Sequence, residues 1–176
     1  MLHELTRVLP PPASPVDPGK REEWPSIEAA VELSLPPDYK DFVNRYGSGG
    51  IDDWIFIFNP FSTREYGNLR NEIAGCLGAL RQLRDEFHEE IPYPIHPEPG
   101  GLVPWGCTSN GDVLYWVTRG PPSDWTVCIN EGRGPEWEEY PYSMVGFLVK
   151  LLTGEITVRI FPDDVRLGPG SRFMSK

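Results

Sequence analysis

Residues 102–118 read Leu-Val-Pro-Trp-Gly-Cys-Thr-Ser-Asn-Gly-Asp-Val-Leu-Tyr-Trp-Val-Thr. Two mainly apolar runs, 102–108 and 113–118, flank the dipeptide Asn110-Gly111. Asn-Gly is a strong short-range hairpin signal, because the favoured two-residue turn needs a positive φ at both central positions. The stretch therefore predicts two antiparallel β-strands joined by a tight turn.

Four further segments have the composition of β-strands, rich in β-branched and aromatic residues. They are residues 51–58, 125–130, 137–140 and 155–161. The first of them, Ile-Asp-Asp-Trp-Ile-Phe-Ile-Phe, is predicted to be one central strand that Asn59-Pro60 ends. Because regular crossover helices do not separate the strands, an antiparallel sheet is favoured over a parallel, Rossmann-like sheet.

Within the domain, helical periodicity appears in four places, near residues 24–33, 37–46, 64–89 and 143–153. Leu2, Leu5, Val8 and Leu9 also have helical spacing, before a Pro-rich run that ends any helix. Between residues 37 and 46, apolar side chains fall at i, i+3, i+4 and i+7, which brings them onto one helix face. The segment 64–89 carries the longest apolar series, and Ser143 is a suitable N-cap for the last helix. The chain is therefore predicted to be an α+β domain, with an antiparallel sheet of about five to six strands packed with helices.

Length and composition indicate one folded domain with two extensions. The 176 residues are 39% apolar and include six Trp, seven Tyr and eight Phe, enough for a sizeable core. Residues 1–21 are expected to form an N-terminal arm with a Pro-rich spacer, and residues 22–161 the domain itself. Residues 162–176 are expected to form a basic tail, with residues 165–176 mobile.

The charge distribution bears on the class of partner. The formal net charge is −10, and residues 22–164 alone carry −14, so a phosphate-binding footprint is missing and nucleic acid is not the expected partner. No apolar stretch reaches membrane-spanning length and no signal-peptide pattern is visible, which indicates a cytoplasmic protein without a membrane partner. Three widely spaced cysteines suit reduced thiols better than a disulfide framework.

Residue types that support catalysis are present but scattered. Metal ligands at recognisable spacing are missing, so neither a metal nor a cofactor is expected. A Cys-His nucleophile pair is conceivable, for instance Cys107 with His96, yet Cys107 falls within a predicted strand, where a buried, inert thiol is the usual outcome. The run Gly47-Ser48-Gly49-Gly50 follows a helix and opens a strand, which is the reverse order of a phosphate-binding loop. We therefore expect no enzymatic activity.

Acidic residues supply the candidate binding site. They are either a solvated face that aids solubility or a patch that attracts a basic partner and speeds its association. Two acidic stretches, around residues 86–98 and 131–139, contain almost no Lys or Arg, and residues 52 and 53 are both aspartate. The candidate partner-binding residues are Asp52, Asp53, Glu89, Glu90, Glu131, Glu136, Glu138 and Glu139.

Several segments taken together resemble one known family. They are Trp24-x-x-Ile27-Glu28, Leu35-Pro36-Pro37-Asp38-Tyr39-Lys40-Asp41-Phe42-Val43, Tyr46-Gly47-Ser48-Gly49, Pro104-Trp105-Gly106, Asn110-Gly111-Asp112-Val113-Leu114-Tyr115-Trp116, and Ser143 to Leu152. The set spans about residues 22–154 and resembles the SUKH superfamily, which includes bacterial toxin-immunity proteins and the fungal cell-wall regulator of the Knr type.

The resemblance implies helices against an antiparallel sheet and no catalysis. For many bacterial members it also implies neutralisation of a polymorphic toxin, often a nuclease or deaminase, encoded by the neighbouring gene. The signature residues look like fold-makers, so the resemblance transfers a fold better than a binding site. The first hypothesis is therefore an immunity protein that binds a cognate protein toxin through its acidic surface, and the alternative is a housekeeping regulatory or scaffolding module of the Knr-like type. Neither hypothesis fixes the oligomeric state.

Overall fold

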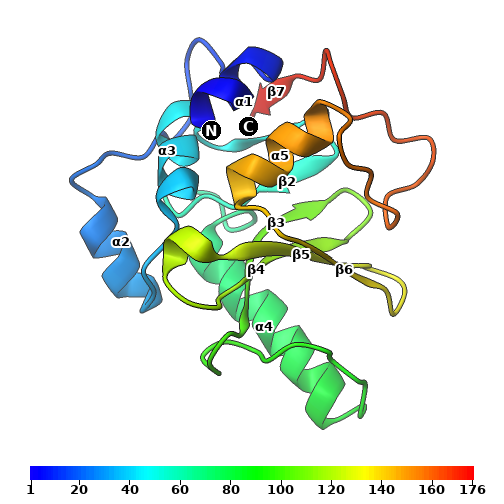
Figure 1. Cartoon of the computed structure of the whole chain (residues 1–176). Helices are drawn as coiled ribbons and strands as arrows, with labels where there is room; N and C mark the ends of the chain where they lie inside the picture. Colours follow the sequence, from blue (N-terminus) through cyan, green and yellow to red (C-terminus); the bar gives the residue numbers. More distant parts are fainter.

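A seven-stranded antiparallel sheet runs through the computed structural model, which describes all residues from Met1 to Lys176 (Figure 1). Its spatial order is β6-β5-β4-β3-β2-β1-β7. The strands are β1 (Gly49–Ile51), β2 (Ile55–Ile57), β3 (Leu102–Thr108), β4 (Val113–Val117), β5 (Thr126–Asn130), β6 (Trp137–Tyr140) and β7 (Phe173–Ser175). The predicted α+β class and antiparallel sheet are confirmed, as is the 102–118 hairpin that forms β3 and β4. Its turn differs from the expected one, because only Gly111, and not Asn110, has a positive φ.

Helices cover both faces of the sheet. They are α1 (Leu2–Val8), α2 (Trp24–Val31), α3 (Pro37–Tyr46), α4 (Leu69–Asp85) and α5 (Met144–Leu152), with a 3-10 turn, η1 (Pro122–Asp124). Helix α5 packs against α1 and α3, whereas α4 packs on β3 (Figure 1). The helical segments predicted from periodicity are therefore present, with α4 shorter at both ends than expected. No helix is both long and apolar enough to cross a lipid bilayer.

The alternation of side chains along β4 divides the apolar residues into two clusters. Leu114 and Trp116 belong to the larger cluster, in which Tyr39 of α3 and Phe147 of α5 are also fully buried. Tyr115 and Val117 belong to a smaller cluster with Leu77 and Leu80 of α4. Successive residues of a strand point to opposite faces, so one strand serves both layers.

Residues of the family signature hold the helices to the sheet. The Asp38 carboxylate accepts hydrogen bonds from the backbone N–H of Tyr39 and, across 107 residues of sequence, of Val145 at the start of α5. The buried Tyr39 hydroxyl donates to the Phe58 carbonyl oxygen at 2.6 Å. Burial raises the pKa of Tyr39 well above its usual value, so this hydroxyl keeps its proton and remains a donor. These side chains are structural, as the resemblance suggested.

The predicted single strand over residues 51–58 is wrong. Residues 49–57 form a hairpin in which β1 pairs with β2, and the chain reverses between Ile51 and Ile55. Asp52 and Asp53 have φ values of 49° and 53°, the left-handed conformation that a tight hairpin turn requires. Aspartate tolerates this conformation better than most residues, but no glycine or asparagine marks the turn, and the apolar composition continues through it.

Both ends of the chain pack onto the domain. Leu5 and Leu9 are fully buried, and the Tyr46 hydroxyl donates to the Leu9 carbonyl oxygen at 2.6 Å. The tail was expected to be mobile, which is wrong for residues 173–175, because they form the edge strand β7 against β1. The boundaries at residues 21 and 161 stay a prediction.

The strand expected at residues 155–161 is absent. Val158 and Phe161 are buried in the larger cluster, but the chain around them does not join the sheet. The backbone N–H of Arg159 instead donates to the Glu138 carboxylate at 3.2 Å. The apolar residues here fill the core from an irregular segment. The sheet nevertheless has seven strands, more than the five to six expected. The 49–57 hairpin supplies two strands where one was predicted, and β7 supplies another that was not predicted.

Candidate functional site

Three of the candidate acidic residues meet at one groove. Glu89 and Glu90 follow the C-terminal end of α4, and Glu131 follows β5; all three line a cavity of about 610 Å³. None of the three carboxylates forms an ion pair within the chain, because every ion pair in the structure involves other acidic residues. The remaining lining residues are Leu80, Leu83, Ile91, Asn130, Gly132, Arg133, Gly134, Pro135 and Trp137. We call this cavity the acidic groove.

The floor of the acidic groove is apolar and its rim is charged. Trp137 forms one wall and is held by two tyrosines, with its ring centroid 5.5 Å from that of Tyr93 and 6.0 Å from that of Tyr115. Long cationic side chains bury their methylene stems on apolar surface and leave the charged head in a polar environment. The groove therefore has the chemistry to accept a lysine or arginine side chain of a partner.

The Asn-Gly-Asp hairpin positions the loop that carries Glu131. Asp112 is fully buried, and its two carboxylate oxygens accept hydrogen bonds from the Thr108 hydroxyl at 2.7 Å and from the Gly132 N–H at 3.0 Å. A Cβ atom added at Gly132 would lie 2.4 Å from the carbonyl carbon of Gly111. The tip of the β3–β4 hairpin and the β5–β6 loop thus touch through their backbones, which fixes one side of the acidic groove.

The candidates on β6 point in different directions. Glu138 is only 7% exposed, and its carboxylate accepts hydrogen bonds from Arg159 and from the Tyr140 hydroxyl. Glu139 lies on the opposite face, where it pairs with Arg119 at 3.0 Å. Glu136 is exposed beside the start of β6. Glu138 is therefore turned away from the acidic groove and Glu139 is partly neutralised.

The remaining candidates, Asp52 and Asp53, lie far from the acidic groove. They occupy the β1–β2 turn, and β1 is five positions from β6 in the sheet, which is roughly 24 Å at the usual spacing of strands. The Asp52 carboxylate accepts from the backbone N–H of Arg172 at 2.8 Å, and Asp53 pairs with Lys176 at 2.5 Å. Both side chains thus help to attach β7 to the sheet.

The residues of the conceivable nucleophile pair have environments unlike those of catalytic groups. Burial, followed by the nearby charge of Glu72, raises the pKa of Cys107 to about 12, which is opposite to the shift that activates a thiol. Burial and the charge of Arg81 lower the pKa of His96, and His96 does not contribute to the shift at Cys107. The structure contains no group of three or more His, Cys, Asp or Glu residues that could hold a metal ion.

The apolar part of this site could not be predicted from the sequence. The acidic residues stood out by composition, but the apolar floor did not, because Leu80 and Trp137 belong to elements distant in the sequence. The strand predicted over residues 137–140 did contain a usable signal. Alternation along it places Glu138 and Glu139 on opposite faces, so only one of them could serve a given surface.

The α+β domain, with helices on both faces of an antiparallel sheet, is consistent with the fold of the SUKH superfamily, and the signature residues build its scaffold. Comparison with known families agrees. The family model SUKH_6, described as SMI1-KNR4 cell-wall, matches residues 21–144, which is more than half of the chain. The chain therefore belongs to this family, and the resemblance inferred from the sequence is confirmed. Domains of this family are generally non-catalytic. No curated protein and no solved structure shows a significant match.

Proposed function

We propose that this protein is a non-catalytic immunity protein of the bacterial type, which binds a cognate protein toxin in the cytoplasm and neutralises it. Membership of the SUKH family is consistent with a binding domain of this kind. The observation that carries the proposal is the acidic groove, which is lined by apolar side chains and by three unpaired carboxylates against a single cation, Arg133. A toxin that acts on nucleic acid, such as a nuclease or a nucleic-acid deaminase, has a basic substrate cleft, and the groove complements such a surface.

The contact is proposed to centre on Glu89, Glu90 and Glu131. Fields of opposite sign raise the rate at which two proteins associate and disfavour partners of like charge. Glu136 is exposed and adds negative charge at the start of β6, whereas the charge of Glu139 is offset by Arg119. Asp52 and Asp53 lie too far away to join the same small contact, so they would meet only a partner that extends across the sheet.

The experiment is co-expression with the product of the neighbouring gene. The triple variant Glu89→Gln, Glu90→Gln, Glu131→Gln is compared with a control that removes the same charge elsewhere, Glu22→Gln, Asp163→Asn, Asp164→Asn. All three control residues are exposed and lie outside the groove. We expect the groove variant to associate at least about tenfold more slowly at low salt and to protect cells less, while the control behaves like the natural protein.

Two results would contradict the proposal. The immunity function fails if the natural protein neither binds the neighbouring product nor protects against its toxicity. The assignment of the surface fails if the groove variant and the control bind equally well. Recovery of regulatory or cell-wall proteins alone in a pull-down would favour the housekeeping interaction module instead.

A further inference from the structure

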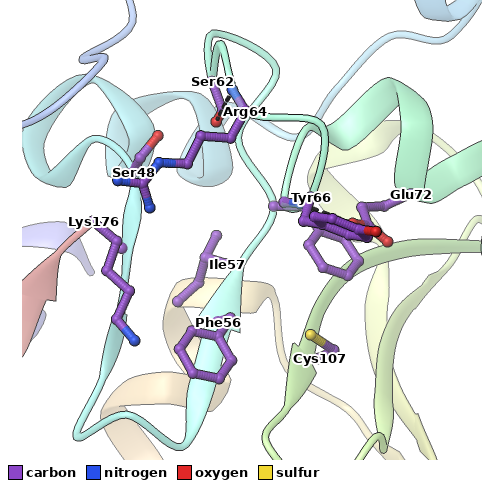
Figure 2. A pocket seen from close by; sticks show the side chains of 12 residues that line it. Ser48, Phe56, Ile57, Ser62, Arg64, Tyr66, Glu72, Cys107 and Lys176 are labelled. Atoms are coloured by element: carbon purple, nitrogen blue, oxygen red, sulfur yellow. Dashed lines mark hydrogen bonds between the residues drawn. The ribbon is translucent and has the colours of Figure 1, made fainter.

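A second cavity lies at the opposite end of the sheet from the acidic groove. It has a volume of about 320 Å³ and is lined by residues of β1, β2, β3 and α4, by the loop between β2 and α4, and by Lys176, which follows β7 (Figure 2). It is lined by Ser48, Gly49, Phe56, Ile57, Phe58, Ser62, Arg64, Tyr66, Gly67, Glu72, Cys107 and Lys176. This size is at the lower end of the range for small-molecule sites.

The floor of this cavity is apolar. Phe56 and Cys107 are register partners on β2 and β3, so their side chains lie on the same face of the sheet. A Cβ atom added at the neighbouring Gly50 would lie 2.8 Å from Cδ1 of Phe56, so the phenyl ring occupies space that a larger residue would fill. The high pKa of Cys107 keeps its thiol uncharged. An apolar body can therefore pack here against neutral groups.

Two cationic side chains reach the cavity from different segments (Figure 2). The guanidinium of Arg64 has no hydrogen-bond or ion-pair partner in the chain; the residue's one hydrogen bond runs from its backbone N–H to the Ser62 hydroxyl at 3.2 Å. The Lys176 ammonium lies 4.6 Å from the centroid of the Phe56 ring and also pairs with Asp53. Arg64 is thus a free cation above an apolar floor.

The one carboxylate in the cavity does not occupy that cation. An oxygen of Glu72 accepts a hydrogen bond from the backbone N–H of Gly67 at 2.8 Å, and Glu72 forms no ion pair with Arg64 or Lys176. Lys176 is paired with Asp53, and Glu72 is engaged by the backbone of Gly67, so Arg64 is the one cation lining the cavity that has no partner in the chain. The cavity therefore offers an unpaired guanidinium in a protein whose net charge is −10.

We propose that this cavity binds a small apolar carboxylate. The aromatic or aliphatic body packs on Phe56 and Cys107, and the carboxylate receives charge-assisted hydrogen bonds from Arg64, with Lys176 close by. A guanidinium matches a carboxylate through two parallel N–H···O bonds, which favours this anion over a neutral group. The same chemistry is offered by a free small acid and by the C-terminal residue of a peptide. The inference does not depend on the proposed immunity function.

The test is a titration of the full chain with 4-phenylbutyrate, followed by two-dimensional amide NMR. We expect saturable shifts at the amides of Phe56, Ile57 and Gly67, with a dissociation constant on the order of 1 mM, as is usual for a ligand of this size. The uncharged analogue 4-phenylbutanol has the same body without the carboxylate and should bind at least about fivefold more weakly. N-acetyl-Gly-Phe, with a free or an amidated carboxyl group, tests the peptide source.

Variants separate the charge from the shape of the cavity. Arg64→Gln should weaken binding of 4-phenylbutyrate about tenfold, because it removes the charged donor from an exposed loop. Its matched control is Arg70→Gln, an exposed arginine at the start of α4 that does not line the cavity, and this change should leave binding unaltered. The NMR spectrum of each variant reports whether the fold is intact.

The outcomes decide the proposal. Binding of the free acid, or of the peptide acid but not its amide, supports it and identifies the source. Absence of shifts at the cavity residues with both carboxylates overturns it. Equal binding of 4-phenylbutanol and 4-phenylbutyrate, or equal binding by Arg64→Gln and the natural protein, also overturns it, because either result removes the role of the carboxylate.

Discussion

The buried carboxylate of Asp112 provides the sharpest test of how the acidic groove is built. Replacement by alanine removes two hydrogen bonds, from the Thr108 hydroxyl and the Gly132 N–H. A hydrogen bond to a charged group contributes about 1.5–3 kcal/mol, and relaxation around the smaller side chain recovers part of the sum. We expect Asp112→Ala to lower the free energy of unfolding by about 3 kcal/mol. For a chain of this size that is a drop in Tm of about 6–12 °C.

The assay is urea denaturation followed by tryptophan fluorescence. The midpoint should fall with little change in the m-value, because the surface exposed on unfolding is nearly the same. Asp112→Asn keeps one acceptor oxygen and should lose only about 1–2 kcal/mol. Asp163→Asn, at an exposed residue, is the control and should stay within about 0.5 kcal/mol of the natural protein.

A double-mutant cycle links the loss to the particular contact. Thr108→Val removes the hydroxyl that donates to Asp112, so the two changes together should cost about 1 kcal/mol less than the sum of the single changes. If Asp112→Ala lowers the free energy of unfolding by less than about 0.5 kcal/mol, the carboxylate does not hold the hairpin to the β5–β6 loop. The account of how the groove is positioned would then be refuted.

Three other predictions concern the glycine contact, the N-terminal helix and the thiols. Gly132→Ala places a Cβ 2.4 Å from the backbone of Gly111 and should destabilise the protein by at least about 2 kcal/mol in urea, whereas Gly75→Ala, in open space on α4, should stabilise it by about 0.5–1 kcal/mol. Leu5→Ala should cost about 2–4 kcal/mol because Leu5 is fully buried, and a change below about 0.5 kcal/mol would mean that α1 is not docked in solution. Burial raises the pKa of Cys107 from 9.0 to about 12, so on raising the pH the unfolded chain loses the thiol proton before the folded chain does. The contribution of Cys107 to the free energy of unfolding should therefore be constant below about pH 9 and decline between about pH 9 and 12. If the free energy of unfolding of Cys107→Ala falls as steeply over this pH range as that of the natural protein, the prediction is contradicted.

Regular elements were accessible from the sequence because their periods are local. The repeat of three and four residues identified α3 and α4, and Asn110-Gly111 identified the β3–β4 hairpin, but not the register shift between Pro104 and Gly106. These signals need only neighbouring residues, since a helix or a tight turn makes its hydrogen bonds within a few positions. The sequence segment around Asp38 likewise indicated the family, because its residues are consecutive in the chain.

Where the local signal was ambiguous, long-range contacts decided the structure. Asp52 and Asp53 adopt a turn within an apolar run, because β1 and β2 gain pairing partners on both sides when the chain reverses. Residues 173–175 pair with β1 although their basic surroundings suggested a mobile tail. In each case the energy comes from strands that are distant in the sequence.

The sequence alone determined the class of fold, the family, and the acidic character of the domain. The tertiary structure decided which acidic residues act together: it brought Glu90 and Glu131 to one groove, turned Glu138 toward the core, and paired Asp53 with Lys176. It also placed Arg64 above the apolar floor formed by Phe56 and Cys107. Such sites are assembled from loops and strand faces of different elements, and no period in the chain records which of these elements meet.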